Sequence, residues 1–428
     1  MIAFAVDLFS SYNLIIEASV IIILSFFFGE LARKTNIPSV LMLIILGMTL
    51  KVLVDTFSDH QFNFFPILEI LGIVGLIMIV LEAALELELK REKLVPISVA
   101  FGVALVGLMA STWMAALVLE EFIPGMTTQS AWIYATPLSI LSSAIIIPSV
   151  TGLKHDKKEF HIYESTFSDI LGILLFYFLL GQMDPEHPTG AAGYGLKVLL
   201  TIAISLVASY VIVFVFQNIK THVKLFLLIA VLLLLYAIGK KMHLSSLIII
   251  LVFGLLIANM KLFFKGPLGE WLNMEKAKDI YEGLHVVTME TAFVVRTFFF
   301  VVFGLTISIA SLANFRVFVV SALILLSIYL IRFAILRLAI GKDIIPQLYV
   351  APRGLITILL YYNIPEVAEI EGFNPGILLF IIIATSIIMT IAMVYDKRKN
   401  SAAIREANSM SVGYTKWKAP ALPTDGNS

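Results

Sequence analysis

The sequence consists of long apolar runs separated by short polar breaks. A run of about 20 apolar residues can cross the hydrocarbon core of a bilayer as an α-helix, which satisfies its own backbone hydrogen bonds. The pattern therefore predicts an all-α, polytopic membrane protein with about 13 transmembrane helices. The predicted spans are residues 12–33, 38–56, 65–88, 94–119, 129–152, 159–181, 194–218, 222–239, 243–261, 288–310, 314–338, 345–362 and 374–395.

The composition agrees with this class of protein. Hydrophobic residues make up 60% of the 428 residues and charged residues 14%, whereas soluble domains are near half apolar and a quarter charged. Lys and Arg (30) balance Asp and Glu (30), so we expect no nucleic-acid partner. The absence of cysteine excludes disulfides and thiolate chemistry. We expect a single transmembrane domain over residues 1–395, then a cytoplasmic, disordered tail over 396–428.

The charges of the loops predict the orientation in the membrane. Loops on one side carry most of the lysines and arginines, and those on the other side carry almost none; Lys240, Lys241 and Arg316 depart from this pattern. By the positive-inside rule, the N-terminus lies outside and the C-terminus in the cytoplasm. An odd number of spans requires the same arrangement.

Thirteen spans divide naturally into six, one and six. Because one span separates the two halves, the second half is inverted relative to the first, which is a common plan among secondary transporters. We expect inverted repeats at about 12–181 and 222–395, joined by a linker helix at about 194–218. Discontinuous helices are predicted to cross between the repeats.

Two spans at matching positions of these repeats are interrupted. The fifth contains Pro137 and Pro148 around Ser142 and Ser143, and the twelfth contains Pro346, Pro352 and Gly354. Paired broken helices indicate an ion site at mid-membrane depth. The alternative is that these prolines only kink ordinary membrane helices.

Few ionisable residues lie inside the predicted spans, and each is a functional candidate by default. Asp169 is at the centre of the sixth span, with Ser165 one turn before it on the same helix face and Ser168 adjacent. Carboxylate, hydroxyl and freed carbonyl oxygens suit a hard cation, so we expect a hard-cation site at Asp169 that also includes Ser142 and Ser143. The alternative is a polar contact between helices.

The other charged candidates are expected to form pairs. Arginine stays protonated and needs a partner inside the membrane, so we expect Arg353 to pair with Glu164. Arg296 either balances the charge of Asp169 or pairs with Glu290. Glu82 is either part of the ion site or solvated near the cytoplasmic surface.

Four motifs resemble those of one transporter superfamily. Residues 163–169 (YESTFSD) are similar to the Gly-Glu-Ser-Leu-Leu-Asn-Asp motif of NhaP-type sodium/proton exchangers, and 351–354 (APRG) to their later Arg-Gly motif. Residues 81–85 (LEAAL) resemble the Phe-Glu-Ala-Ala-Leu segment of their third span. Residues 29–33 (GELAR) with the following Ile-Pro resemble the first hairpin of the wider monovalent cation/proton antiporter superfamily.

The resemblance implies a secondary antiporter that exchanges protons for a monovalent cation by alternating access, with no cofactor. Asp169 would bind Na⁺ or a proton in turn, Ser165 and Glu82 would assist it, and Glu164 would pair with Arg353. A core of spans 3–6 and 10–13 would rock against a scaffold of spans 1–2 and 8–9. It further implies a homodimer, and we expect it in the bacterial inner membrane.

The chain departs from that branch at two places, which leaves the cation open. Ser168 replaces Asn, and residues 143–148 (SAIIIP) replace a Thr-Asp-Pro segment. Residues 142–144 are closer to potassium-efflux relatives, so a K⁺/proton antiporter is the alternative, and Li⁺ is a further possible substrate. A cation channel is disfavoured because no repeated acidic ring is found, and an enzyme because no catalytic motif is found.

Overall fold

The computed structural model describes residues 11–35, 39–57, 65–87, 89, 91–183, 191–219, 224–241, 246–264, 274–306 and 314–410. Within these residues all regular structure is helical. The first part of the chain forms α1 (Ser11–Thr35), α2 (Ser39–Phe57), α3 (Phe65–Glu86), α4 (Leu94–Phe122), α5 (Thr128–Ser139), α6 (Ser143–Ser149), α7 (His155–Gln182) and α8 (Ala191–Phe216). The second part forms α9 (Lys224–Lys241), α10 (Ser246–Ala258), α11 (Met260–Phe263), α13 (Met274–Thr306), α14 (Phe315–Ala339), α15 (Leu355–Tyr361) and α16 (Gly376–Met410).

Each predicted span overlaps one of these helices or a pair of them, and the all-α class is confirmed. Seven of the described helices are long and apolar enough to cross a membrane, and shorter apolar helices accompany them. The number thirteen and the orientation stay predictions. The seven are Leu94–Phe122, Thr128–Ser149, His155–Gln182, Val198–Phe216, Met274–Thr306, Phe315–Ala339 and Gly376–Lys397.

Two predicted boundaries are wrong. Residues 345–349 form a turn and 350–354 have no helical structure, so the predicted span 345–362 is helical only in α15. Pro346 and Pro352 explain this, because proline lacks an N–H and disfavours helical geometry in the residue before it. At the other end, α16 continues to Met410, so residues 396–410 of the predicted disordered tail are helical; residues 411–428 lie outside the described residues.

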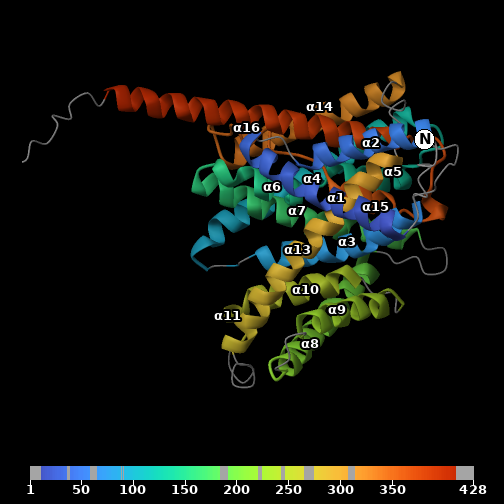
Figure 1. Cartoon of the computed structure of the whole chain (residues 1–428), viewed down its shortest axis with the longest axis vertical. Helices are drawn as coiled ribbons and strands as arrows, with labels where there is room; N and C mark the ends of the chain where they lie inside the picture. Colours follow the sequence, from blue (N-terminus) through green and yellow to red (C-terminus); the bar gives the residue numbers. More distant parts are fainter. Residues whose placement is uncertain are drawn as a thin grey trace, which may run out of the picture.

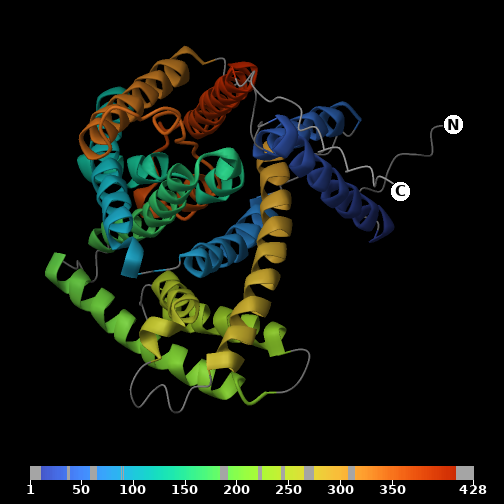
Figure 2. The ribbon, with the colours of Figure 1, turned by 90° about the vertical axis from the view of Figure 1, so that its left-hand side faces the viewer.

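The helices form two bundles. Helices α4, α5, α6, α7, α14, α15 and α16 pack together, and we call them the core bundle. Helix α13 packs along α2 and α3, while α10 packs on α3, α8 and α9; these helices and α1 form the α13 bundle. Figure 2 shows α13, in gold, running from α1 and α2 toward the green helices and away from the core bundle. In Figure 1, α16 extends well beyond the other helices.

This division differs from the expected one, in which spans 3 and 10 belong to the core. The packing of α3 and α13 is mainly with each other and with α2 and α10. Gly254 of α10 lies directly against Ala84 of α3, and Gly47 of α2 lies against Gly304 of α13. Such close backbone approach, which small residues allow in membranes, ties α3 and α13 to the α13 bundle.

The core bundle is organised around two breaks that cross, as predicted. The first separates α5 from α6 at residues 140–142, and the second precedes α15 at Gly354. Ser142 N–H donates to the Pro352 carbonyl at 3.0 Å, which joins the breaks directly. Leu141 N–H donates to Ser168 Oγ at 3.0 Å. These contacts satisfy backbone donors that the interruption removes from a helix.

Gly354 is required by the closeness of this crossing. A Cβ atom at this position would lie 2.5 Å from Ser142 Oγ and 2.9 Å from the Ile145 side chain. The absence of a side chain therefore lets the second break pass against the start of α6.

Candidate functional site

Asp169 lies in the middle of α7, on the side of the core bundle that faces α3 and α10. It is 2% exposed, and neither carboxylate oxygen has a hydrogen-bond partner among the described residues. Ser143, the first residue of α6, is close enough to act on the carboxylate. A buried carboxylate with no well-formed hydrogen bond is costly, whereas a proton or a bound cation would satisfy these oxygens.

The cavity next to Asp169 is small and mostly apolar. A cavity of about 10 Å³ beside the carboxylate is bounded by α3, α7, α10 and α15. Since α3 and α10 belong to the α13 bundle, this cavity lies where the two bundles meet. Its other lining residues are Ile79, Val80, Ala83, Ile170, Ile173, Leu174, Leu247, Ile248, Leu251 and Ile356.

The four candidate serines occupy different positions in the core bundle. Ser165 Oγ donates to the His161 carbonyl at 2.7 Å, so its own lone pairs remain for another contact. Ser168 Oγ accepts the Leu141 N–H and so supports the first break. Ser142 packs against Gly354 at the crossing. Ser143 is therefore the serine that the structure brings to Asp169 from another helix.

Glu82 and Arg296 form an ion pair within the α13 bundle. Arg296 Nη2 lies 3.0 Å from Glu82 Oε2, and Arg296 Nη1 donates to the Ala144 carbonyl at 3.2 Å. The alternative in which Arg296 pairs with Glu290 is wrong: Glu290 lies on the exposed face of α13. Arg296 thus joins α3 to the first turn of α6, next to Ser143.

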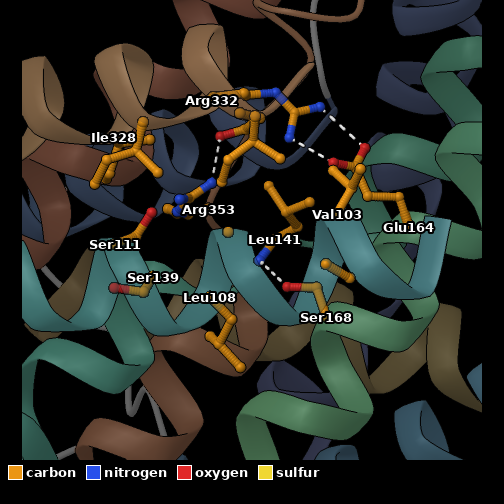
Figure 3. Close-up of a pocket in the computed structure, with 15 residues that line it drawn as sticks. Val103, Leu108, Ser111, Ser139, Leu141, Glu164, Ser168, Ile328, Arg332 and Arg353 are labelled. Carbon is orange, nitrogen blue, oxygen red and sulfur yellow. Dashed lines mark hydrogen bonds and ion pairs between the residues drawn. The ribbon is translucent and has the colours of Figure 1, made fainter. Parts of the chain in front are cut away.

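Glu164 pairs with Arg332 of α14, and the predicted pair with Arg353 is wrong. Arg332 Nη1 and Nη2 lie 2.7 and 3.0 Å from the two oxygens of Glu164 in a bidentate contact (Figure 3). Arg332 also donates to the Gln347 carbonyl at 2.9 Å from Nη2. His161 Nδ1 lies 3.2 Å from Glu164 Oε2. The carboxylate is 1% exposed, and its geometry matches a guanidinium fork.

Arg353 instead holds the two breaks together. Its Nε donates to the Leu138 carbonyl at the end of α5 at 2.9 Å, and its Nη1 to the Ala351 carbonyl at 2.8 Å. Its backbone N–H donates to Thr385 Oγ1 of α16 at 3.0 Å. The non-helical backbone of residues 350–354 places Arg353 over the end of α5 rather than over Glu164.

Comparison with known proteins identifies the family of the chain. A family model described as sodium/hydrogen exchanger, transmembrane, matches residues 20–397. The chain belongs to the sodium/hydrogen exchanger family. It is accordingly an integral membrane transporter for cation/proton antiport rather than an enzyme, and the transported ions are its substrates.

The fold of the exchanger is that of known antiporters. It resembles the structure of the sodium proton antiporter MjNhaP1 from Methanocaldococcus jannaschii at pH 8, with a TM-score of 0.65, 18% identity and coverage of 89% of this chain and 98% of that chain. A second structure of MjNhaP1, from an electron-microscopy map, gives a TM-score of 0.60 at 19% identity, with coverage of 96% and 100%. No curated protein sequence matches.

Arg332 is the residue of the exchanger's site that the sequence analysis missed. It lies well inside the apolar run 314–338 and carries a permanent charge, so the rule applied to the other intramembrane charges selects it too. The sequence then allows either Arg332 or Arg353 as the ion-pair partner of Glu164. The packing of α14 against α4 brings Arg332 to Glu164.

Proposed function

We propose that this chain exchanges protons for Na⁺ across the membrane by alternating access, with Asp169 holding either ion in turn. The observation that supports the proposal is the buried Asp169 carboxylate, whose oxygens have no hydrogen-bond partner among the described residues. A proton and a cation compete for the same oxygens, so their movements are coupled. Ser143 and Ser165 would supply further oxygen ligands to the cation.

The charge pairs favour the exchange of one proton for one cation. Glu82 has Arg296 as its partner, and Glu164 has Arg332. Asp169 has no arginine partner among the described residues, so its carboxylate can bind a proton or a Na⁺ as its counter-charge. One carboxylate that binds one proton or one Na⁺ moves no net charge over a full cycle.

Alternating access would be a movement of the core bundle against the α13 bundle. Asp169 lies on the core bundle, and the cavity beside it is closed by α3 and α10 of the α13 bundle. A shift between the bundles would open this apolar contact to one side and then the other. Following the family resemblance, we propose a homodimer in the bacterial inner membrane with the N-terminus outside.

Exchange in proteoliposomes tests this function. The full chain is reconstituted with a pH-sensitive dye inside, a pH gradient is imposed, and Na⁺, Li⁺ or K⁺ is added with the membrane potential clamped. We expect a saturable proton flux with Na⁺, which Asp169→Asn abolishes and Asp156→Asn preserves. Asp156 is a matched control because it is an exposed carboxylate in the first turn of the same helix.

Other results would replace parts of the proposal. A response to K⁺ alone would make the chain a K⁺/proton antiporter. A cation flux that needs no proton gradient would indicate a channel, and retained exchange in Asp169→Asn would remove Asp169 from the mechanism. A rate that changes with the clamped potential would contradict one-for-one exchange, because moving one charge against 100 mV costs about 2.3 kcal/mol.

A further inference from the structure

Arg353 is a buried cation whose guanidinium hydrogen-bonds only to neutral backbone carbonyls among the described residues. It is 2% exposed, and its guanidinium donates only to the Leu138 and Ala351 carbonyls. A guanidinium has five N–H groups, so most of its donors are unused by the described residues. Burying a charge without a counter-charge is strongly unfavourable, and Arg353 therefore needs an anionic or polar partner that the described residues do not provide.

The neighbouring carboxylates do not provide it. Both oxygens of Glu164 are engaged by Arg332. Asp169 faces a different, apolar cavity. The groups that interact electrostatically with Arg353 are Tyr329, Arg332 and Glu164, and the charges of the two arginines and the glutamate sum to +1.

A small cavity with both apolar and polar lining lies against Arg353. Its volume is about 30 Å³, which is room for about two water-sized spheres. Arg353, Arg332, Glu164, Ser111, Ser139 and Ser168 contribute its polar lining. Figure 3 shows the Ser111 hydroxyl, from α4, directed toward the Arg353 guanidinium.

A second buried polar group near Arg353 has no hydrogen-bond partner among the described residues. The Tyr329 hydroxyl of α14 makes no hydrogen bond among the described residues, and it is close enough to interact with the Arg353 charge. Ser139 offers no compensation, because its hydroxyl donates to the Ala135 carbonyl in its own helix. The environment of Arg353 therefore has an excess of positive charge, and several guanidinium N–H groups have no acceptor among the described residues.

We infer that this cavity binds a small monovalent anion of the size of chloride, held by Arg353 and Ser111. The anion would neutralise the guanidinium at the point where the two helix breaks cross. This site lies on a different face of the core bundle from the proposed cation site, and it does not depend on the proposed function.

Binding of radioactive chloride to the purified full chain tests the inference. The chain is held in sodium gluconate, ³⁶Cl⁻ is added, and bound chloride is measured by scintillation proximity. We expect saturable binding of one chloride per chain, displaced by bromide and not by gluconate. Ser111→Val removes the hydroxyl and adds a methyl group to the cavity, so it should weaken binding at least tenfold.

Thr112→Val is the matched control. Thr112 is the neighbouring residue in α4, fully buried, and does not line the cavity, so this variant should bind chloride as the parent chain does. Both variants must first show a parent-like elution profile in gel filtration. Absent or non-saturable binding, or equal binding in Ser111→Val, would overturn the inference.

A crystal structure of the full chain grown in sodium bromide gives a second, direct answer. We expect an anomalous bromide peak within hydrogen-bond distance of the Arg353 guanidinium. Density for water alone at this position, or a direct ion pair between Arg353 and Glu164 that fills the cavity, would show that no anion site exists.

Discussion

Burial makes the ion pair between Glu164 and Arg332 sensitive to a change at either residue. Removing one partner leaves an uncompensated buried charge, which costs about 3–5 kcal/mol. We expect Glu164→Gln and Arg332→Met each to lower the thermal unfolding temperature strongly, and the double variant to lose less than the sum. Unfolding of the purified chain in detergent, followed by intrinsic fluorescence, measures all three.

Arg353 supplies the control for this double-mutant cycle. Arg353→Met combined with Glu164→Gln should give more nearly additive losses, since these side chains share no hydrogen bond. Strong coupling in that pair and none between Glu164 and Arg332 would support the pairing expected from the sequence instead.

We expect the ion pair of Glu82 with Arg296 to affect the proposed ion site through its charge. Glu82→Gln would leave the Arg296 charge unpaired beside Ala144 and Ser143, where it would repel an incoming cation. We expect the KM for Na⁺ to rise about tenfold, the factor that about 1.4 kcal/mol of repulsion produces. The double variant Glu82→Gln, Arg296→Gln should recover most of the affinity, and proton flux at increasing Na⁺ measures both. If the double variant is no better than the single, the effect is not electrostatic.

At the scale of helices, the contact of α2 with α13 depends on two glycines. A Cβ on Gly304 would lie 2.5 Å from the Ile44 carbonyl and 2.9 Å from Gly47 Cα, and a Cβ on Gly47 would meet the Val301 carbonyl. The atoms in the way are backbone atoms, so the helices must separate to make room.

Gly304→Ala should therefore destabilise the protein, by about 1–3 kcal/mol or more. Gly102→Ala in α4 is the control, because a Cβ there meets nothing within 4 Å; it should be neutral or slightly stabilising, since alanine is the better helix former. Yield of monodisperse protein and unfolding temperature distinguish the two variants. Equal behaviour would mean that the α2–α13 contact is looser than described.

At the scale of the whole molecule, the proposed alternating access requires the two bundles to move against each other. Ile173 of α7 and Leu251 of α10 line the cavity beside Asp169 from opposite bundles. The chain has no cysteine, so a cysteine pair at these positions can be joined by a short bifunctional thiol reagent without background reaction. Cross-linking should abolish exchange in proteoliposomes, and a cleavable linker should restore it on reduction.

A second cysteine pair separates immobilisation from chemical damage. Ala83 of α3 lines the same cavity, but α3 and α10 belong to the same bundle. Joining residues 83 and 251 should leave exchange largely intact. Loss of exchange with both pairs would point to blockage of the cavity, and loss with neither would contradict relative movement of the bundles at this contact.

The sequence by itself determined the class of the protein, because apolar length and the need to satisfy backbone hydrogen bonds leave little choice in a membrane. It also located the two breaks, since Pro346, Pro352 and Gly354 act through local backbone geometry. Asp169 was selected for the same kind of reason: a charge in the middle of an apolar run is identified from the run alone.

The tertiary structure alone decided which charges meet and which helices belong together. Glu164 forms an ion pair with Arg332, and Glu82 forms one with Arg296. Arg353 donates hydrogen bonds to backbone carbonyls. The sequence does not show where a charged side chain points, whereas an ion pair needs two side chains within about 4 Å of each other. That distance is set by how whole helices pack, through contacts such as Gly47 against Gly304, which lie far apart in the chain.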